Sequence, residues 1–144
     1  MIYCDTSVLV AALTLEPHSE PVLGWLDGVG AGALCISGWV VTEFSSAIAL
    51  KARMGVIPAA ERDIVLANWH RFRRESLNIV PVRQGVFGAA AQLCEEAGSQ
   101  LRSGDALHLA IAIEGGHQLA TLDKVLTQAA QLHGVELAGP APNA

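Results

Sequence analysis

Short apolar segments alternate with longer segments of helical periodicity along the chain, and this alternation restricts the possible folds more than any other feature. We expect strands at 1–4, 33–36, 77–82, 117–121 and 134–137. We expect a first helix at 8–13 and a second that follows a break at 17–20 and continues through Trp25 and Leu26. Further helices are expected at 39–54, 58–75, 84–97, 105–114 and 123–132, and a Pro/Ala tail ends the chain. Strands separated by helices predict an α/β fold with a central parallel sheet.

Length and composition predict one globular domain spanning 1–144. Hydrophobic residues make up 51% of the chain and charged residues only 16%, which argues against disorder. No apolar run reaches the roughly 18 residues of a membrane span, and the N-terminus lacks the basic start of a signal peptide. Cys4, Cys35 and Cys94 have no CxxC spacing and are interpreted as buried thiols of a reducing compartment. We therefore expect a cytoplasmic protein.

Four acidic residues lie at, or within two turns of, the start of a helical segment. Asp5 follows the first strand, and Asp123 follows the fourth. Asp105 opens the most apolar helix, while Glu43 lies in the second turn of the helix at 39–54. Helices that follow parallel strands begin at the carboxyl edge of the sheet, where ligands bind in open α/β folds. Taken singly, each Asp is better explained as a helix cap or a partner of the helix dipole, and Glu43 as a solvated residue.

Convergence of the four acids would require a cation. Two carboxylates about 5 Å apart repel by roughly 3 kcal/mol at an effective dielectric near 20, so such a cluster raises its own pKa values or binds a positive charge. Oxygen ligands alone favour Mg²⁺ or Mn²⁺. Such an ion polarises a phosphoryl oxygen and lowers the pKa of a bound water. Nearby hydroxyls that are suited to orienting water belong to Thr6, Ser7, Thr42 and Thr121.

Basic residues are concentrated in one part of this acidic chain, whose formal net charge is −5. Residues 51–83 hold seven of the nine bases and only three acids. Such a segment is either a polyanion-binding edge or a solvated helical face, and the charges alone do not decide between them. The candidates for RNA binding are Lys51, Arg53, Arg71, Arg73 and Arg74, with Arg62 and Arg83 completing the segment.

Four motifs now carry a resemblance to a known family. The chain contains, in order, YCDTSVLVA, VVTEF, SGDALHLA and LATLDKVL. In this order and spacing they resemble a PIN-domain ribonuclease, and within that group the VapC toxins of bacterial toxin–antitoxin pairs. The resemblance implies a three-layer α/β/α sandwich with strand order 3-2-1-4-5 and a Mg²⁺- or Mn²⁺-dependent endoribonuclease. It places the acidic metal ligands on Asp5, Glu43, Asp105 and Asp123, and the hydroxyl next to the first acid on Thr6 or Ser7.

The resemblance also implies partners. VapC-like proteins usually form homodimers, or larger assemblies with a small VapB-like antitoxin that inhibits them. The tail of such an antitoxin lies in an apolar groove and directs a basic side chain toward the acids, where a guanidinium neutralises carboxylates in place of metal. Candidate groove or dimer residues are Trp25, Leu26, Trp39 and Trp69, with core packing as the alternative for each.

Two other functions compete with this hypothesis. A haloacid-dehalogenase-like phosphohydrolase also places Asp after its first strand, but here Ser7 stands where a second acid is wanted and no Lys adjoins Asp105. A non-catalytic α/β binding module would use the acids only as helix caps. His108, a polar residue on an apolar helix, is expected to be a hydrogen-bonded core histidine rather than a catalytic base. The glycines at 28, 30 and 32 do not have the spacing of a phosphate-binding loop.

Overall fold

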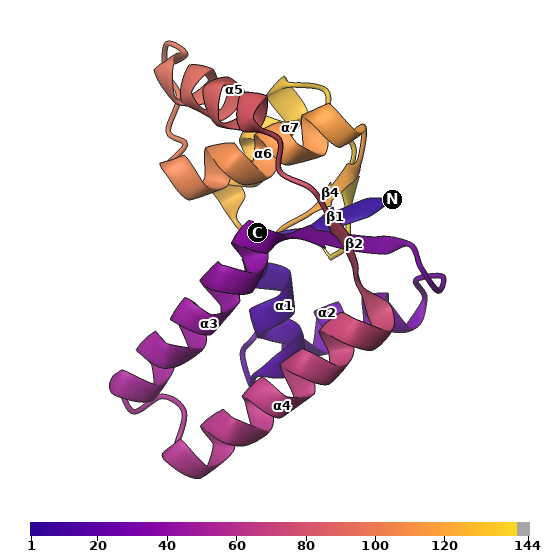
Figure 1. The fold of residues 1–144 in the computed structure, drawn as a ribbon, viewed down its shortest axis with the longest axis vertical. Coiled ribbons are helices and arrows are strands. Elements are labelled where there is room, and N and C mark those ends of the chain that lie inside the picture. The colour runs from indigo at the N-terminus through magenta and orange to yellow at the C-terminus, as the bar shows by residue number, and fades with distance from the viewer. Residues whose placement is uncertain (141–144) are drawn as a thin grey trace.

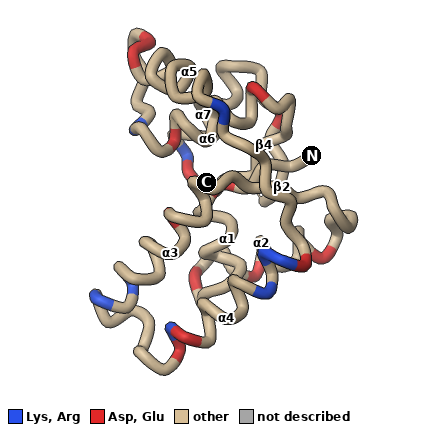
Figure 2. Tube along the Cα trace, viewed as in Figure 1, with Lys and Arg blue, Asp and Glu red and all other residues tan. Residues whose placement is uncertain are grey.

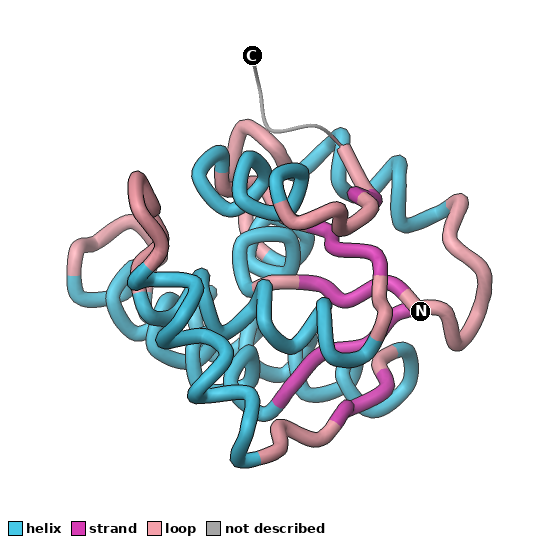
Figure 3. The backbone as a smooth tube through the Cα atoms, turned by 90° about the horizontal axis from the view of Figure 1, so that it is seen from above, coloured by secondary structure: helices cyan, strands magenta, loops and turns pink. Residues whose placement is uncertain are grey.

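A five-stranded parallel sheet forms the centre of the molecule in a computed structural model that describes residues 1–140. The strand order is β3-β2-β1-β4-β5, and Figure 3 shows the strands side by side. The strands are β1 (Ile2–Cys4), β2 (Leu34–Ser37), β3 (Asn78–Val80), β4 (Gln118–Ala120) and β5 (Leu137–Ala138). This confirms the expected α/β class and strand order, with the first strand of the chain at the centre.

Helices cover both faces of the sheet and make it the middle of three layers (Figure 1). The helices are α1 (Thr6–Leu13), α2 (Ser19–Asp27), α3 (Gly38–Arg53), α4 (Ala59–Ser76), α5 (Gln84–Glu95), α6 (Ser103–Gly115) and α7 (Lys124–Leu132). The first four lie on one face and the last three on the other. The reason is topological: the chain moves from β1 out to β3, then returns to β4 and β5 on the other side of β1. Right-handed crossovers place helices on opposite faces when that direction reverses.

The core is built around β1 and α6. Tyr3 and Cys4 of β1 are fully buried, and every residue of α6 from Ala106 to Ala112 is buried, as expected for a helix that is apolar nearly all round. A second contact joins α3 to α4, where the rings of Phe44 and Trp69 stack with centroids 4.2 Å apart. Both rings are fully buried.

That stacking corrects one interpretation. Trp69 is a core residue and is not available as a groove or dimer residue, because the inner face of α4 packs it directly onto α3. Trp25 and Leu26 are partly buried against the same core. Trp39 remains at the surface with 36% exposure.

Several local boundaries also differ from those expected. The third strand covers 78–80 rather than 77–82, since Pro81 has no N–H to extend the ladder. The fifth begins at Leu137 rather than at 134, because Gly134 turns the chain at φ +69° and the Val135 N–H bonds back to Ala130. Ser37 precedes α3 without capping it through its side chain.

Three further expectations are resolved or lie outside the described residues. Cys4 and Cys35 are buried, whereas Cys94 is only partly buried, and all three thiols are free. The Pro/Ala tail lies mostly outside the described residues. Within residues 1–140, no helix is long and apolar enough to cross a bilayer.

Candidate active site

An open cleft of about 500 Å³ lies at the carboxyl edge of the sheet, beside the point where the strand order reverses. All four acids identified in the sequence line it. The lining residues are Asp5, Thr6, Ser7, Trp39, Thr42, Glu43, Ser46, Ala47, Leu50, Asp105, His108 and Asp123. These lining residues include no Lys or Arg.

Asp5 lies between β1 and α1 and is only 4% exposed. Its Oδ1 accepts hydrogen bonds from the Ser7 hydroxyl at 2.5 Å and the Val8 N–H at 3.3 Å, while its Oδ2 accepts from the Thr121 hydroxyl at 2.5 Å. Burial raises the pKa of Asp5, although the charge of His108 and these donors oppose that rise. Asp5 is therefore both the N-cap of α1 and a carboxylate fixed at the edge of the cleft.

Glu43 is held by two side chains from other elements. Its Oε2 accepts hydrogen bonds from the Thr6 hydroxyl and from Nε2 of His108, the latter at 2.6 Å. Partial burial raises the pKa of Glu43, but hydrogen bonds from His108, Thr6 and Trp39 and the charge of His108 outweigh it and hold this pKa below its usual value. The carboxylate is therefore kept ionised.

Asp105 and Asp123 complete the acidic lining of the cleft. Asp105 lies in the first turn of α6. Its pKa is raised first by burial and then by the charge of Asp123, with Asp5 and Glu43 adding to the rise and His108 opposing it. Asp123 caps α7 by accepting from the Leu126 N–H at 2.7 Å. The repulsion among these acids is the kind of charge imbalance that a bound cation relieves.

The donor set fits a hard divalent cation, although no three His, Cys, Asp or Glu side chains within residues 1–140 form a ready-made metal cluster. Mg²⁺ keeps several of its waters and is commonly bound through only one or two carboxylates, so a closed protein cage is not required. The cleft supplies four carboxylates and has room for water and substrate. Oxygen donors without thiols or basic competitors suit Mg²⁺ or Mn²⁺.

The hydroxyls expected near the acids have distinct partners. Thr6 donates to Glu43, while Ser7 and Thr121 donate to Asp5. Thr42 lines the cleft, but its hydroxyl lies 3.5 Å from the Gly38 carbonyl of its own helix. The network behind Glu43 was not identified from the sequence: His108 also contacts Tyr3, which contacts Ser37. The only indication of this network in the sequence was His108, a polar residue within an apolar helix.

The basic residues do not gather at the cleft. Figure 2 shows Lys and Arg at the far end of α3 and at both ends of α4, with others at the start of α5 and near α6. Lys51 and Arg53 lie in the last turn of α3, the helix that lines the cleft with Glu43, Leu50 and other residues on the same face. The remaining candidates, Arg71, Arg73 and Arg74, lie near the end of α4, just before β3. Because β3 begins there, these three are at the amino edge of the sheet, opposite the acids.

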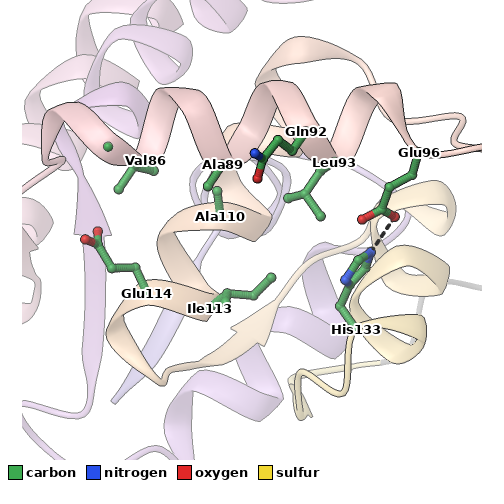
Figure 4. A pocket seen from close by; sticks show the side chains of 10 residues that line it. Val86, Ala89, Gln92, Leu93, Glu96, Ala110, Ile113, Glu114 and His133 are labelled. Atoms are coloured by element: carbon green, nitrogen blue, oxygen red, sulfur yellow. Dashed lines mark hydrogen bonds and ion pairs between the residues drawn. The ribbon is translucent and has the colours of Figure 1, made fainter.

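A second hollow of about 260 Å³ lies between α5, α6 and α7 (Figure 4). Its lining is mostly small or apolar, including Val86, Ala110 and Ile113. The ionisable pair at its rim, His133 and Glu96, is satisfied by a 2.9 Å contact between Nε2 and Oε2. This hollow lacks a converging set of reactive groups, so the acidic cleft is the candidate active site.

Comparison with known proteins identifies the family of this chain. The sequence model of the family described as PIN domain matches residues 2–132. The chain is also 31% identical to Ribonuclease VapC35 of Mycobacterium tuberculosis, over 97% of each protein. The chain belongs to the PIN-domain family.

Two solved structures share the fold of this PIN domain. Mycobacterium tuberculosis VapC20, described as a sarcin–ricin loop cleaving toxin, aligns with a TM-score of 0.73 and 16% identity over 97% of this chain and 100% of that chain. VapBC2 from Rickettsia felis, solved with a DNA fragment from its promoter, aligns with a TM-score of 0.71 and 17% identity over 96% and 98%. At these identities the two structures support the fold and do not assign residue roles.

Proposed function

We propose that this PIN domain is a Mg²⁺- or Mn²⁺-dependent endoribonuclease. The observation that carries the proposal is the convergence of four carboxylates, from four separate parts of the chain, on one open cleft without a Lys or Arg in its lining. The relative that is 31% identical and is named a ribonuclease supports RNA as the substrate.

Asp5, Glu43, Asp105 and Asp123 would hold the cation. When bound, such an ion stabilises charge on a phosphoryl oxygen and lowers the pKa of a bound water. The chain itself contributes orientation. Ser7 and Thr121 fix Asp5, Thr6 fixes Glu43, and the open side of the cleft admits an extended polyanion.

RNA is proposed to extend from the cleft along α3 toward Lys51 and Arg53. Leu50 borders the acids, and Lys51 follows it directly. Lys51 also pairs with Glu16 at 2.6 Å, which holds its ammonium near the end of α1. With a net charge of −5, the protein depends on such local bases to attract phosphate.

The competing functions explain the site less well. Ser7 donates to Asp5 and so does not supply the second acid of a haloacid-dehalogenase-like enzyme. A module with acids only as helix caps accounts for Asp5 and Asp123, which do cap helices. It does not account for Glu43, which lies inside α3 and is bound by His108 and Thr6.

We propose that the protein is the toxin of a toxin–antitoxin pair in the cytoplasm. A groove of about 440 Å³ between the end of α1, α3 and α4 suits the apolar tail of a VapB-like antitoxin. Its rim exposes Val56 and Ile64, each 60% exposed, and Leu15, which is 98% exposed. Leu50 borders the acidic cleft and Lys51 borders the groove, so a tail seated here can extend a basic side chain to the acids.

A second copy of the chain is the proposed partner for another apolar hollow, of about 310 Å³. Trp39, Phe87 and Leu107 line it, and Phe87 is 52% exposed. Trp39 borders both this hollow and the acidic cleft, which would bring the two active sites of a homodimer near their shared interface. Light scattering of the purified protein, with Phe87→Glu as the disrupting variant, measures this association.

The first experiment uses purified protein on total RNA with Mg²⁺, with Mn²⁺ and with EDTA. We expect cleavage with either ion and none in EDTA. Asp5→Asn is expected to lower the rate at least 10- to 100-fold, the loss seen even for partners outside the ligand sphere of a metal. Asp27→Asn, an exposed acid at the end of α2, is the matched control. Equal cleavage by the Asp5→Asn and Asp27→Asn proteins would exclude the proposed site.

The role as a toxin has a separate test. Expression of the chain alone is expected to arrest bacterial growth, and expression of Asp5→Asn at the same soluble level is not. Normal growth with the active protein present would leave an RNA-cleaving enzyme without a toxin function. Co-expression of the adjacent open reading frame tests for the antitoxin.

A further inference from the structure

We propose that His108 is the positioning residue for Glu43, and that Tyr3 and Ser37 hold His108 in place from behind. This inference rests on the proposed function, since it gives the imidazole a task in presenting one carboxylate to the cation. The four residues come from α6, α3, β1 and β2. Their side chains therefore connect both helical layers through the centre of the sheet.

The contacts form an unbroken series of hydrogen bonds. Ser37 Oγ lies 2.8 Å from Tyr3 Oη, which lies 3.0 Å from Nδ1 of His108. Nε2 of His108 then lies 2.6 Å from Oε2 of Glu43. Tyr3 and Ser37 are fully buried and His108 is 3% exposed, while Glu43 is partly exposed at the cleft. The series therefore runs from the core to the active-site surface.

The carboxylate of Glu43 fixes the position of one hydrogen in this series. An ionised carboxylate only accepts, so Nε2 of His108 must carry the hydrogen that is shared with Glu43. Nδ1 of His108 shares the next hydrogen with the Tyr3 hydroxyl, which in turn shares a hydrogen bond with the Ser37 hydroxyl. Every polar atom in the series has a partner.

Glu43 is confined on its other side by Gly104. A Cβ added at Gly104 would lie 3.0 Å from Oε1 of Glu43, which is closer than an unstrained contact. Oε2 accepts hydrogen bonds from Thr6 and His108, and Trp39 adds a further hydrogen bond to the carboxylate. A long side chain on α3 is thus held in one orientation by groups from other elements and by Trp39 of its own helix.

A packing histidine would have the same burial but no effect on metal binding, and this difference supplies the test. Manganese binding is measured by calorimetry on metal-free protein for wild type, His108→Leu and His108→Gln. We expect His108→Leu to weaken binding about 10- to 100-fold. His108→Gln should recover most of that loss because its amide N–H can replace Nε2–H. Binding by His108→Leu equal to wild type, or no recovery in His108→Gln, would overturn the proposal.

Gly104→Ala provides an independent variant with an intact His108. Alanine favours a helix more than glycine does, so thermal stability should not fall, yet the new methyl group crowds Oε1 of Glu43. We expect weaker Mn²⁺ binding with an unchanged or higher Tm. Unchanged binding would show that Glu43 is not confined as described.

An NMR measurement separates failure of this inference from failure of the proposed function. Nitrogen-15 shifts of the His108 ring, recorded without metal or RNA, should show a protonated Nε2 in the wild type. They should also show a changed environment at Nδ1 in Tyr3→Phe. A bare Nε2 would overturn the positioning role even if the enzyme cleaves RNA. A protonated Nε2 in a protein that neither binds Mn²⁺ nor cleaves RNA would retain the hydrogen-bond assignment, but would overturn both the ribonuclease proposal and the metal-positioning role.

Discussion

The Thr121 hydroxyl donates a 2.5 Å hydrogen bond to Oδ2 of Asp5, although 116 positions separate the two residues in the chain. Thr121 follows β4 and Asp5 follows β1, and these strands are neighbours at the point where the strand order reverses. The same hydroxyl oxygen accepts from the backbone N–H of Asp123 at 3.0 Å. One side chain therefore ties two of the four acids to a single edge of the sheet.

Thr121→Val is expected to destabilise the protein and to weaken metal binding. Valine keeps the shape but removes the donor to a buried carboxylate, which costs about 1 to 3 kcal/mol. Chemical denaturation measures the free energy of unfolding, and calorimetry measures Mn²⁺ affinity. Thr121→Ser retains the hydroxyl and should stay closer to wild type. A valine protein as stable as wild type, with a less stable serine protein, would show that packing of the methyl group rather than the hydrogen bond stabilises the fold at this position.

Asp105→Asn is expected to stabilise the metal-free protein at neutral pH. Burial and the neighbouring acids raise the pKa of Asp105 in the folded state above its unfolded value. The native state therefore holds its proton more tightly, and stability is lost as pH rises from the unfolded pKa through the raised one. Because the group is partly exposed and screened, the gain at pH 7 should stay below about 1 kcal/mol.

Denaturation in EDTA at several pH values measures this difference. The gain from Asp105→Asn should shrink toward zero below the unfolded pKa, where both side chains are neutral. Asp27→Asn, far from the cleft, should show no such trend. A gain that does not change with pH would point to packing rather than charge.

Divalent ions should offset the repulsion among the clustered acids and so raise the free energy of unfolding. A ligand that binds only the native state at about 100 times its Kd adds about 2.7 kcal/mol to the free energy of unfolding. Mn²⁺ is therefore expected to raise the Tm of the wild type in a concentration-dependent manner, and to raise that of Asp5→Asn much less. An equal rise in both proteins would place the bound ion elsewhere.

Trp69→Ala should be among the most destabilising single changes in the chain. Loss of a fully buried aromatic ring costs about 3 to 5 kcal/mol, and here it also removes the stacking on Phe44. Trp69→Phe should be milder, because it keeps an aromatic ring and removes an indole N–H that has no hydrogen-bond partner among the described residues. Trp39→Ala, at the surface, is the comparison in the same denaturation assay. Equal losses at Trp39 and Trp69 would contradict the core assignment.

The position of the bases predicts which of them contact RNA. Each phosphate contact to a single strand contributes about 0.7 to the slope of log affinity against log salt concentration. Replacing Lys51 and Arg53 by Ala should lower both the affinity for RNA and the magnitude of this salt slope. The binding assay is done without divalent ions, so that the RNA stays uncleaved. Replacing Arg71 and Arg74, at the amino edge, should change neither. A reversed result would place the RNA on α4.

Much of the fold could be predicted because local patterns define it. The alternation of strands and helices indicated a parallel sheet, the resemblance to PIN domains implied its strand order, and both were confirmed. Boundaries were less certain where backbone chemistry decides, as at Pro81 and Gly134. Core and surface tryptophans looked alike in the sequence, because burial depends on which helix faces which and not on the residue itself.

The sequence by itself determined the type and order of the candidate ligands: four acids, each near the start of a helix, in motifs that resemble a PIN domain. Only the tertiary structure decided which groups surround them. It brought Thr121 to Asp5 and His108 to Glu43 across 116 and 65 positions, and it placed Arg71, Arg73 and Arg74 on the opposite edge. The physical reason is that the sequence of a short strand indicates its own alternation of side chains but not which strands lie beside it. Its neighbours are set by the crossovers and by the packing of a core drawn from the whole chain.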